Sequence, residues 1–420
     1  MEFGVPQLEI LAVFLAVYAL IVVRRIGRFK VEVWMAMLLG AVALLSLGAV
    51  SLGEALMAIN SQVILFLIGS FLIVGVMAQT GLLQAVAVAV LRRARTPSRL
   101  LLFVIAFVSV ASAFLVNDAV VLVVTPIVIA SCTIAGLKKT PYIIAVALSS
   151  NIGSALTPIG NPQNVLIKIE SGISTLGFMG KMAIPVVLAV AAEYVVLKAI
   201  YRKEMSRGTV LEIPERGPDL MGKAEWRMLI AITVGVMIGF ITSDLTGVPI
   251  AIVALVGGTM ALLLSPDRRE SLKRIDWGTM VFFASMFVVM HSVEASGLLG
   301  FIIDPFRSWL FVGGVGSVAA IFGLSIALSQ LTSNVPFVAM MLPIFRSAGA
   351  SPDQWLSLAA GSTLGGNLTL LGAAANVIVL EAAECKGESF SFIEFMKGGV
   401  PVTIISSAIA IAVLSLLLGI

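Results

Sequence analysis

Apolar runs long enough to cross a bilayer follow one another along almost the whole chain of 420 residues. A helix crosses the hydrocarbon core with about 20 apolar residues, whereas a membrane β-barrel shows short alternating strands. The pattern therefore predicts an all-α polytopic membrane protein. The runs fall at 5–24, 31–50, 61–80, 99–134, 141–167, 175–200, 228–243, 248–265, 276–296, 312–346, 353–382 and 391–419.

Two of these runs, 99–134 and 312–346, are too long for one span and carry polar residues near their centres. We expect each to fold back as a re-entrant hairpin, which leaves ten membrane spans. A further apolar stretch, 81–97, contains Gly81 and ends in basic residues. This stretch is predicted to form a helix that lies in the inner membrane interface.

The basic residues gather in short loops that all fall on one side when the ten spans are counted. By the positive-inside rule that side is the cytoplasm, so both termini are expected outside a multi-pass protein of the cytoplasmic membrane. The net charge of +4 thus reports orientation and indicates no nucleic-acid partner. The loops hold Arg24, Arg25, Arg28, Lys30, Arg92, Arg93, Arg95, Arg99, Lys138, Lys139, Arg202, Lys203, Arg207, Arg216, Lys223, Arg227, Arg268, Arg269, Lys273, Arg274 and Lys386.

The two halves of the chain resemble each other. Asn117 in FLVNDAVVLVVTPI aligns with Asn334 in QLTSNVPFVAMMLPI. The stretch GSALTPIGNPQNV, which begins at Gly153, matches GGNLTLLGAAANV, which begins at Gly365. Because each half contributes five spans, the second copy is expected to be inverted. The predicted organisation is a first repeat at 1–200 with hairpin 99–134 and broken helix 141–167, a cytoplasmic linker at 201–226, and a second repeat at 227–420 with hairpin 312–346 and broken helix 353–382.

Glycines, prolines and amides interrupt both predicted broken helices at membrane depth. Non-helical backbone is tolerated there only where protein or a wet cavity satisfies it, and inverted repeats with broken helices are typical of secondary transporters. The alternative is a helix-packing motif of small residues. The duplication favours one shared site. Its expected substrate- and ion-binding residues are Asn117, Asp118, Ser150, Asn151, Gly153, Thr157, Gly160, Asn161, Asn164, Ser333, Asn334, Ser362, Gly365, Asn367, Thr369, Gly372 and Asn376.

These motifs resemble the ion transporter superfamily, which includes arsenite-efflux permeases, divalent-anion:sodium symporters and citrate carriers. The hairpin tips read Val116-Asn117-Asp118 and Ser333-Asn334-Val335, and each keeps only part of the Ser-Asn-Thr triplet of the divalent-anion symporters. FLVNDAVVLVVTPIVIA is most similar to the arsenite permease branch. The resemblance implies alternating-access transport of a small anion or oxyanion, with arsenite- or antimonite-like export favoured, and a homodimer.

Asp118 is the only acid expected in the membrane core, where carboxylates are costly and usually functional. We expect it to couple transport to a proton, being neutral in one access state and ionised in the other. Sodium coupling is the runner-up, and a plain helix cap is the structural alternative. Sodium would lie near Asn117, Asp118, Gly153, Asn334 and Gly365.

Other function classes stay open or are disfavoured by the residues. Sodium-coupled di- or tricarboxylate uptake, sodium/proton antiport and an anion channel remain alternatives. No nucleotide-binding GxxxxGK[ST] loop occurs and the two cysteines form no cluster, so we expect neither an enzyme, nor a pump within this chain, nor a cofactor other than sodium. His291 with Glu294 could form a proton relay but is expected at the outer interface. Glu193 and Lys198 are expected to snorkel or pair at the cytoplasmic end of their span.

Overall fold

The computed structural model describes residues 5–23, 25–26, 29–206, 223–298 and 308–417. Within these ranges the chain is helical apart from two strands of two residues that pair antiparallel, with Arg25 opposite Lys30. The predicted all-α fold is confirmed. The elements are α1 Val5–Val23, β1 Arg25–Ile26, β2 Phe29–Lys30, α2 Val33–Ser46, α3 Leu52–Ala58, α4 Ser61–Gln79, α5 Leu82–Leu91, α6 Pro97–Phe114, α7 Asn117–Ile134, α8 Thr140–Ser154, α9 Pro162–Ser171, α10 Thr175–Ile200, α11 Arg202–Met205, α12 Lys223–Thr246, α13 Ile250–Leu264, α14 Arg268–Lys273, α15 Trp277–Ala295, α17 Gly314–Thr332, α18 Asn334–Ser347, α19 Pro352–Gly365, α20 Ala374–Glu384 and α21 Phe392–Leu417.

Each of the two long apolar runs forms a pair of helices joined by a very short connection. Leu115 takes an extended conformation between α6 and α7, and Ser333 joins α17 to α18 with a φ of 69°. A positive φ is unusual for a residue with a side chain, so the second tip holds a strained backbone. Whether the hairpins re-enter a bilayer remains a prediction.

The two glycine-rich stretches each separate two helices. The first break lies between α8 and α9. The Asn161 side chain caps α9 by accepting a hydrogen bond from the backbone N–H of Asn164 at 3.0 Å. A β-carbon at Gly153 would lie 2.2 Å from the Ser109 carbonyl oxygen, so only glycine allows α8 to approach α6 this closely. The second break lies between α19 and α20.

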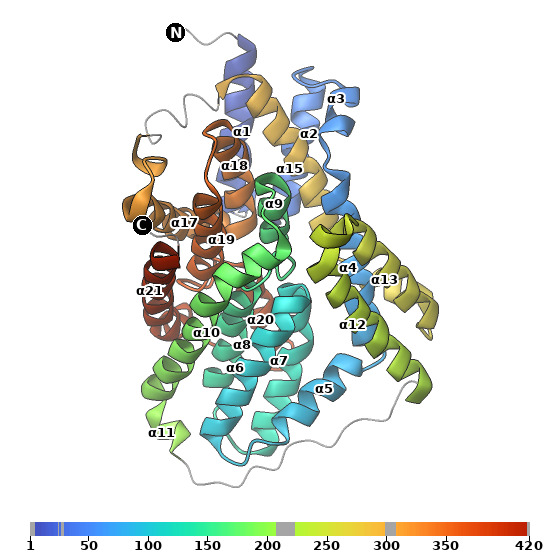
Figure 1. The fold of residues 1–420 in the computed structure, drawn as a ribbon, viewed down its shortest axis with the longest axis vertical. Helices are drawn as coiled ribbons and strands as arrows, with labels where there is room; N and C mark the ends of the chain where they lie inside the picture. The colour runs from blue at the N-terminus through green and yellow to red at the C-terminus, as the bar shows by residue number, and fades with distance from the viewer. Residues whose placement is uncertain (1–4, 24, 27–28, 207–222, 299–307, 418–420) are drawn as a thin grey trace.

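The two halves of the chain interlock. From the second half, α13 packs along α4, while α2 of the first half packs along α15. Helices α7 and α20 pack together, as do α9 and α18, and α10 lies along α21. We call α6–α10 with α17–α21 the core bundle, and α1, α2, α4, α12, α13 and α15 the scaffold; in Figure 1 α4, α12 and α13 lie together at the right, beside α6–α8.

Eight helices in the described ranges are long and apolar enough to cross a membrane, namely α4, α6, α7, α10, α12, α15, α17 and α21. Three of the eight, α6, α7 and α17, belong to the hairpins, so only five of them are among the ten predicted spans. The other five predicted spans are the two broken helices, each made of two pieces that are too short, and three shorter helices. Helices α1, α2 and α13 are shorter apolar helices. Helix α5, within the predicted interfacial stretch, starts after Gly81, whose φ is 73°.

Candidate functional site

Asn151, in the last turn of α8, is the centre of a buried amide cluster. Its Nδ2 donates to Asn367 Oδ1 at 2.8 Å and to Asn376 Oδ1 at 3.0 Å. Its Oδ1 accepts from Asn117 Nδ2 at 3.4 Å. These four side chains, which we call the amide cluster, are each no more than 4% exposed. The cluster therefore joins the first hairpin tip and the first broken helix to the second break and α20.

An asparagine bridges each helix break in the same way. Asn164 Nδ2 donates to the carbonyls of Ser154 at 3.3 Å and Thr157 at 3.2 Å. At the aligned position of the second half, Asn376 Nδ2 donates to the carbonyls of Gly366 at 2.8 Å and Thr369 at 3.1 Å. Both side chains donate to carbonyls that have lost their helical hydrogen bonds where the backbone unwinds. Inside a bilayer such carbonyls need a partner from the protein, because water is absent.

Each hairpin is also tied to its own break. The Thr157 hydroxyl donates to the Ala113 carbonyl, and the backbone N–H of Asn117 donates to the Gly160 carbonyl at 3.0 Å. In the second half, the Thr369 hydroxyl donates to Gln330 Oε1 at 2.9 Å. When Asn117 is aligned with Asn334, Gln330 is the counterpart of Ala113, so hairpin and break meet at matching positions in both halves.

Four polar residues outside the predicted set belong to this network. Ser154 Oγ accepts from Asn161 Nδ2 at 2.9 Å. Gln330 Nε2 donates to the Gly365 carbonyl at 2.9 Å. Thr363 Oγ1 accepts from Asn161 and from Gln163, each at 3.4 Å. The sequence does carry a signal for Gln330 and Gln163. Both are uncharged polar residues within long apolar runs, and both lie within three residues of a predicted site residue.

Several predicted site residues do not point into the network. The hydroxyl of Ser150 donates to the Ala147 carbonyl at 2.8 Å, and that of Ser362 donates to the Leu358 carbonyl at 2.7 Å. Both bonds stay within one helix. Ser333 Oγ contacts its neighbour Asn334 Oδ1 at 3.3 Å at the second tip. At Gly372 a β-carbon would lie 2.6 Å from Gln330 Oε1, so this glycine admits the Gln330 side chain.

The Asp118 side chain is half-buried in the first turn of α7. Among the described residues, no hydrogen bond or ion pair reaches its carboxylate, and no side chain caps the start of α7. Asp118 therefore does not act as a hydrogen-bonding helix cap in this conformation.

Two amide oxygens of the network, Asn117 Oδ1 and Asn164 Oδ1, are buried and have no hydrogen-bond partner in the part of the chain that the structure describes. An unsatisfied buried acceptor is costly unless a ligand or ion supplies the missing contact. No lysine or arginine takes part in the network described above. In the described ranges, no three His, Cys, Asp or Glu side chains come together to hold a metal ion.

A narrow apolar cleft separates the first hairpin tip from the scaffold. It contains only two side-chain hydroxyls, those of Ser70 and Thr233. The cleft is lined by Phe66, Ser70, Ile73 and Val74 of α4, by Phe114, Leu115 and Val116 of the tip, by Ile159 of the first break, and by Thr233, Val236, Met237 and Phe240 of α12. It marks a boundary between core bundle and scaffold.

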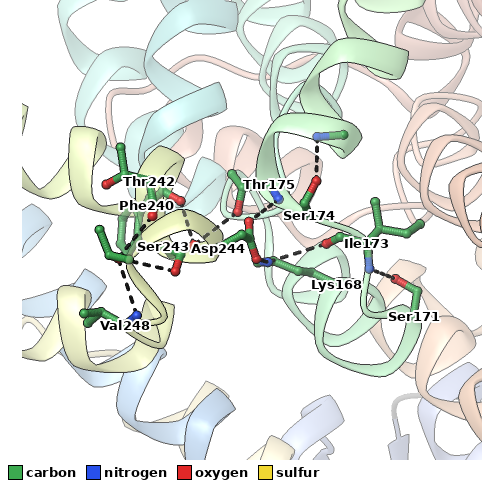
Figure 2. Close-up of polar contacts among 12 residues, drawn as sticks. Lys168, Ser171, Ile173, Ser174, Thr175, Phe240, Thr242, Ser243, Asp244 and Val248 are labelled. Atoms are coloured by element: carbon green, nitrogen blue, oxygen red, sulfur yellow. Dashed lines mark hydrogen bonds and ion pairs between the residues drawn. The ribbon is translucent and has the colours of Figure 1, made fainter.

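At the far end of α9 an ion pair joins the core bundle to the scaffold (Figure 2). Lys168 Nζ donates to Asp244 Oδ1 on α12 at 2.8 Å. The second carboxylate oxygen of Asp244 accepts from the Thr175 amide at 2.5 Å, and Ser174 caps α10. The Lys168 side chain is only 10% exposed. This set of contacts, which we call the α9–α12 link, holds the α9–α10 connection against α12.

The other charged residues singled out in the sequence behave differently. Glu193 is fully buried, and its Oε1 accepts from the Ser149 hydroxyl at 2.7 Å. The expectation that Glu193 snorkels or pairs is therefore wrong, because its side chain points inward from α10. Lys198 is exposed and lies over the Tyr194 ring at 5.3 Å. Glu294 contacts Arg346 at 3.5 Å, so it is engaged at the surface.

Comparison with known proteins places the chain among transporters. Residues 18–361 match the family described as citrate transporter. A 46 kDa membrane protein of Mycobacterium leprae is 30% identical over 95% of this chain and 96% of its own length. A silicon efflux transporter of Oryza sativa subsp. japonica is 26% identical over 89% of this chain and 90% of its own.

The human P protein is 26% identical over 96% of this chain, which spans 59% of that longer protein. The crystal structure of the YdaH transporter of Alcanivorax borkumensis has the same fold, with a TM-score of 0.66, 15% identity, and coverage of 99% of this chain and 98% of that one. The predicted superfamily is confirmed, whereas the arsenite branch within it is not specifically shown. The chain is a multi-pass membrane transporter that belongs to the citrate transporter family.

Proposed function

We propose that this transporter is a secondary active carrier that exports a small oxyanion or its neutral hydroxide, of the arsenite and antimonite kind, across the cytoplasmic membrane. The observation that carries the proposal is the pair of buried oxygens without partners, Asn117 Oδ1 and Asn164 Oδ1, in a network built from amides and hydroxyls. Such oxygens accept hydrogen bonds from a ligand that has O–H groups.

A neutral trihydroxide suits these acceptors because each of its hydroxyl groups can donate a hydrogen bond. An ionised carboxylate of a citrate-like substrate can only accept hydrogen bonds, so it would place one acceptor against another at these oxygens. A polyanion would also normally be held by arginine or lysine, and none contributes to the network described above. Transport of a hydroxide is supported by the likeness to a silicon efflux transporter, since silicic acid is also a neutral hydroxide.

The runner-up is sodium-coupled uptake of a di- or tricarboxylate. The family description favours it, and so do the N-termini of α7 and α18, because helix N-termini attract anions. In that case sodium, and not a hydroxyl donor, would contact the two unpartnered amide oxygens. Sodium/proton antiport and an anion channel are the remaining candidates.

We propose alternating access through movement of the core bundle against the scaffold. The amide cluster belongs wholly to the core bundle, and the apolar cleft beside the first tip separates this bundle from α4 and α12. Asp118 is the proposed coupling residue, because its carboxylate has no hydrogen-bond or ion-pair partner among the described residues and can take up a proton or sodium.

Thermal unfolding of the detergent-purified protein tests the substrate class. A ligand present at 100 times its Kd stabilises the folded state by about 2.7 kcal/mol. We expect arsenite and antimonite to raise Tm, without sodium, in the wild type but not in Asn117→Ala. Stabilisation by citrate or succinate only when sodium is present would favour the runner-up instead. In cells, loss of arsenite export after addition of an uncoupler would distinguish a carrier from a channel.

A further inference from the structure

Glu193 is a buried carboxylate that the transport site described above does not use. It lies in the last third of α10, and its neighbours one turn away on the same face, Ala189 and Leu197, are also fully buried. Its Oε1 accepts from the Ser149 hydroxyl of α8 at 2.7 Å, while its Oε2 is buried and has no hydrogen-bond partner among the described residues. Within the described ranges, the Ser149 hydroxyl is therefore the one hydrogen-bond partner of this carboxylate.

No lysine or arginine of the described residues forms an ion pair with Glu193. The helices packed against α10 are α6, α8, α11, α12, α19 and α21. α8 has no charged side chain, and its one titratable side chain is the phenol of Tyr142. The described charged side chains on the other five helices lie near the helix ends; they are Arg99, Arg202, Lys203, Glu204, Glu225, Arg227, Asp244, Asp353, Glu394 and Lys397. In the described part of the chain none of these groups, nor Lys181 or Lys198 on α10, forms an ion pair with Glu193.

Burying an isolated ionised carboxylate in an apolar interior is far more costly than burying the neutral acid. A metal ion is a poor alternative occupant, because hard cations require many oxygen ligands, and in the described ranges no three His, Cys, Asp or Glu side chains come together to hold one. A proton needs no further ligand. We propose that Glu193 is a proton-binding site of the transporter, separate from Asp118, and that it holds a proton in the present conformation.

The position of Glu193 connects this proton to the transport site. Ser149 lies on the same helix as Asn151, the centre of the amide cluster, and is separated from it only by Ser150. A movement of α8 that rearranges the amide cluster also moves the only hydrogen-bond donor of Glu193. If that movement admits water between α8 and α10, the O–H bond at Oε2 breaks and the proton passes to water, leaving a solvated carboxylate. The coupling role rests on the proposed carrier function, whereas the protonation itself does not.

Infrared spectroscopy of the purified full-length protein tests the protonation directly. An ordinary glutamate is ionised at pH 7, so a carbonyl band of a protonated carboxylic acid at that pH reports an unusual group. We expect the wild type to show this band and Glu193→Gln to lose it, since glutamine keeps the acceptor for Ser149 but cannot hold the acid proton. Ser149→Ala should shift the band without removing it, because the carbonyl loses its donor.

Two control variants make the assignment specific. Glu225→Gln, which removes an exposed carboxylate from α12, should leave the band unchanged. In Asp118→Asn, the absorbance that disappears in Glu193→Gln should still be present. Identical spectra of wild type and Glu193→Gln, with both monodisperse on gel filtration, would overturn the inference. The absence of transport in the wild type would contradict the proposed carrier but not the infrared assignment, so the two failures are distinguishable.

Discussion

At the scale of single residues, the direction of each side chain decides which polar groups form the site. Ser150 and Asn151 are adjacent, yet the Ser150 hydroxyl bonds to its own helix while Asn151 contacts three other asparagines. Position along a helix is readable from sequence, but the rotation of that helix about its axis depends on tertiary packing. For this reason Thr363 was missed, and Ser150 and Ser362 were included.

The role of Asp118 can be separated from structure by Asp118→Asn. The carboxylate makes no hydrogen bond or ion pair with the described residues, so asparagine of similar size should not disturb folding. We expect the variant to exchange substrate across proteoliposome membranes but to fail to concentrate it against a gradient. Counterflow and gradient-driven uptake measure the two activities. Wild-type accumulation with unchanged pH and sodium dependence would remove Asp118 from the coupling mechanism.

At the scale of elements, the breaks and hairpin tips were predictable because their signals are local. Pro162 and Gly160 cannot continue a helix at low cost, and the residues that recur at a fixed offset within each motif relate the hairpins and broken helices of the two halves. Which helix packs against which was not predictable in this way. The burial of Glu193 between α8 and α10 depends on that packing, and so does the meeting of Lys168 with Asp244.

Close packing of α8 against α6 should make Gly153 intolerant of any side chain. Gly153→Ala would place a β-carbon 2.2 Å from the Ser109 carbonyl oxygen, and overpacking of this kind typically costs about 1–3 kcal/mol. The matched control is Gly180→Ala in α10, where nothing lies within 4 Å of the added carbon. Thermal unfolding in detergent should show a clear loss of Tm for the first variant only. Equal Tm values would show that α8 and α6 are not so close.

The α9–α12 link should stabilise the present arrangement of core bundle and scaffold (Figure 2). Asp244→Asn would leave Lys168, whose side chain is 10% exposed, without its ion-pair partner. Because the Asp244 side chain is 33% exposed, the cost should lie between the roughly 1 kcal/mol of a surface pair and the 3–5 kcal/mol of a buried one. Adding Lys168→Met should recover part of the lost Tm. No change in either variant would mean that the pair does not hold these elements together.

At the scale of the whole molecule, the fold class followed from the apolar runs and the superfamily from the repeated motifs, since both are properties of long stretches. The interlocking of the halves did not follow, because α13 on α4 and α2 on α15 are contacts between segments far apart in the chain. The orientation in the membrane rests on the distribution of lysine and arginine alone, so it requires its own test.

Cysteine labelling with a membrane-impermeant reagent tests that orientation. Cys385 is exposed and lies on the predicted inner side, while Cys132 is buried, so intact wild-type cells should stay unlabelled. In a Cys385→Ser background, Ala350→Cys should react from outside and Lys138→Cys only in everted vesicles. Labelling of Lys138→Cys in intact cells, or protection of Ala350→Cys, would invert the topology.

The central claim is that both hairpin tips and both broken helices form one site for a small oxyanion or its hydroxide. Energised everted vesicles test it most directly, because export from the cell becomes accumulation inside the vesicle. We expect wild-type vesicles to accumulate arsenite, and Asn117→Ala and Asn334→Ala each to lose this accumulation at normal membrane abundance and Tm. Wild-type rates of accumulation in either stable variant would contradict a shared site, and no accumulation of arsenite or antimonite by the wild type would contradict the substrate class.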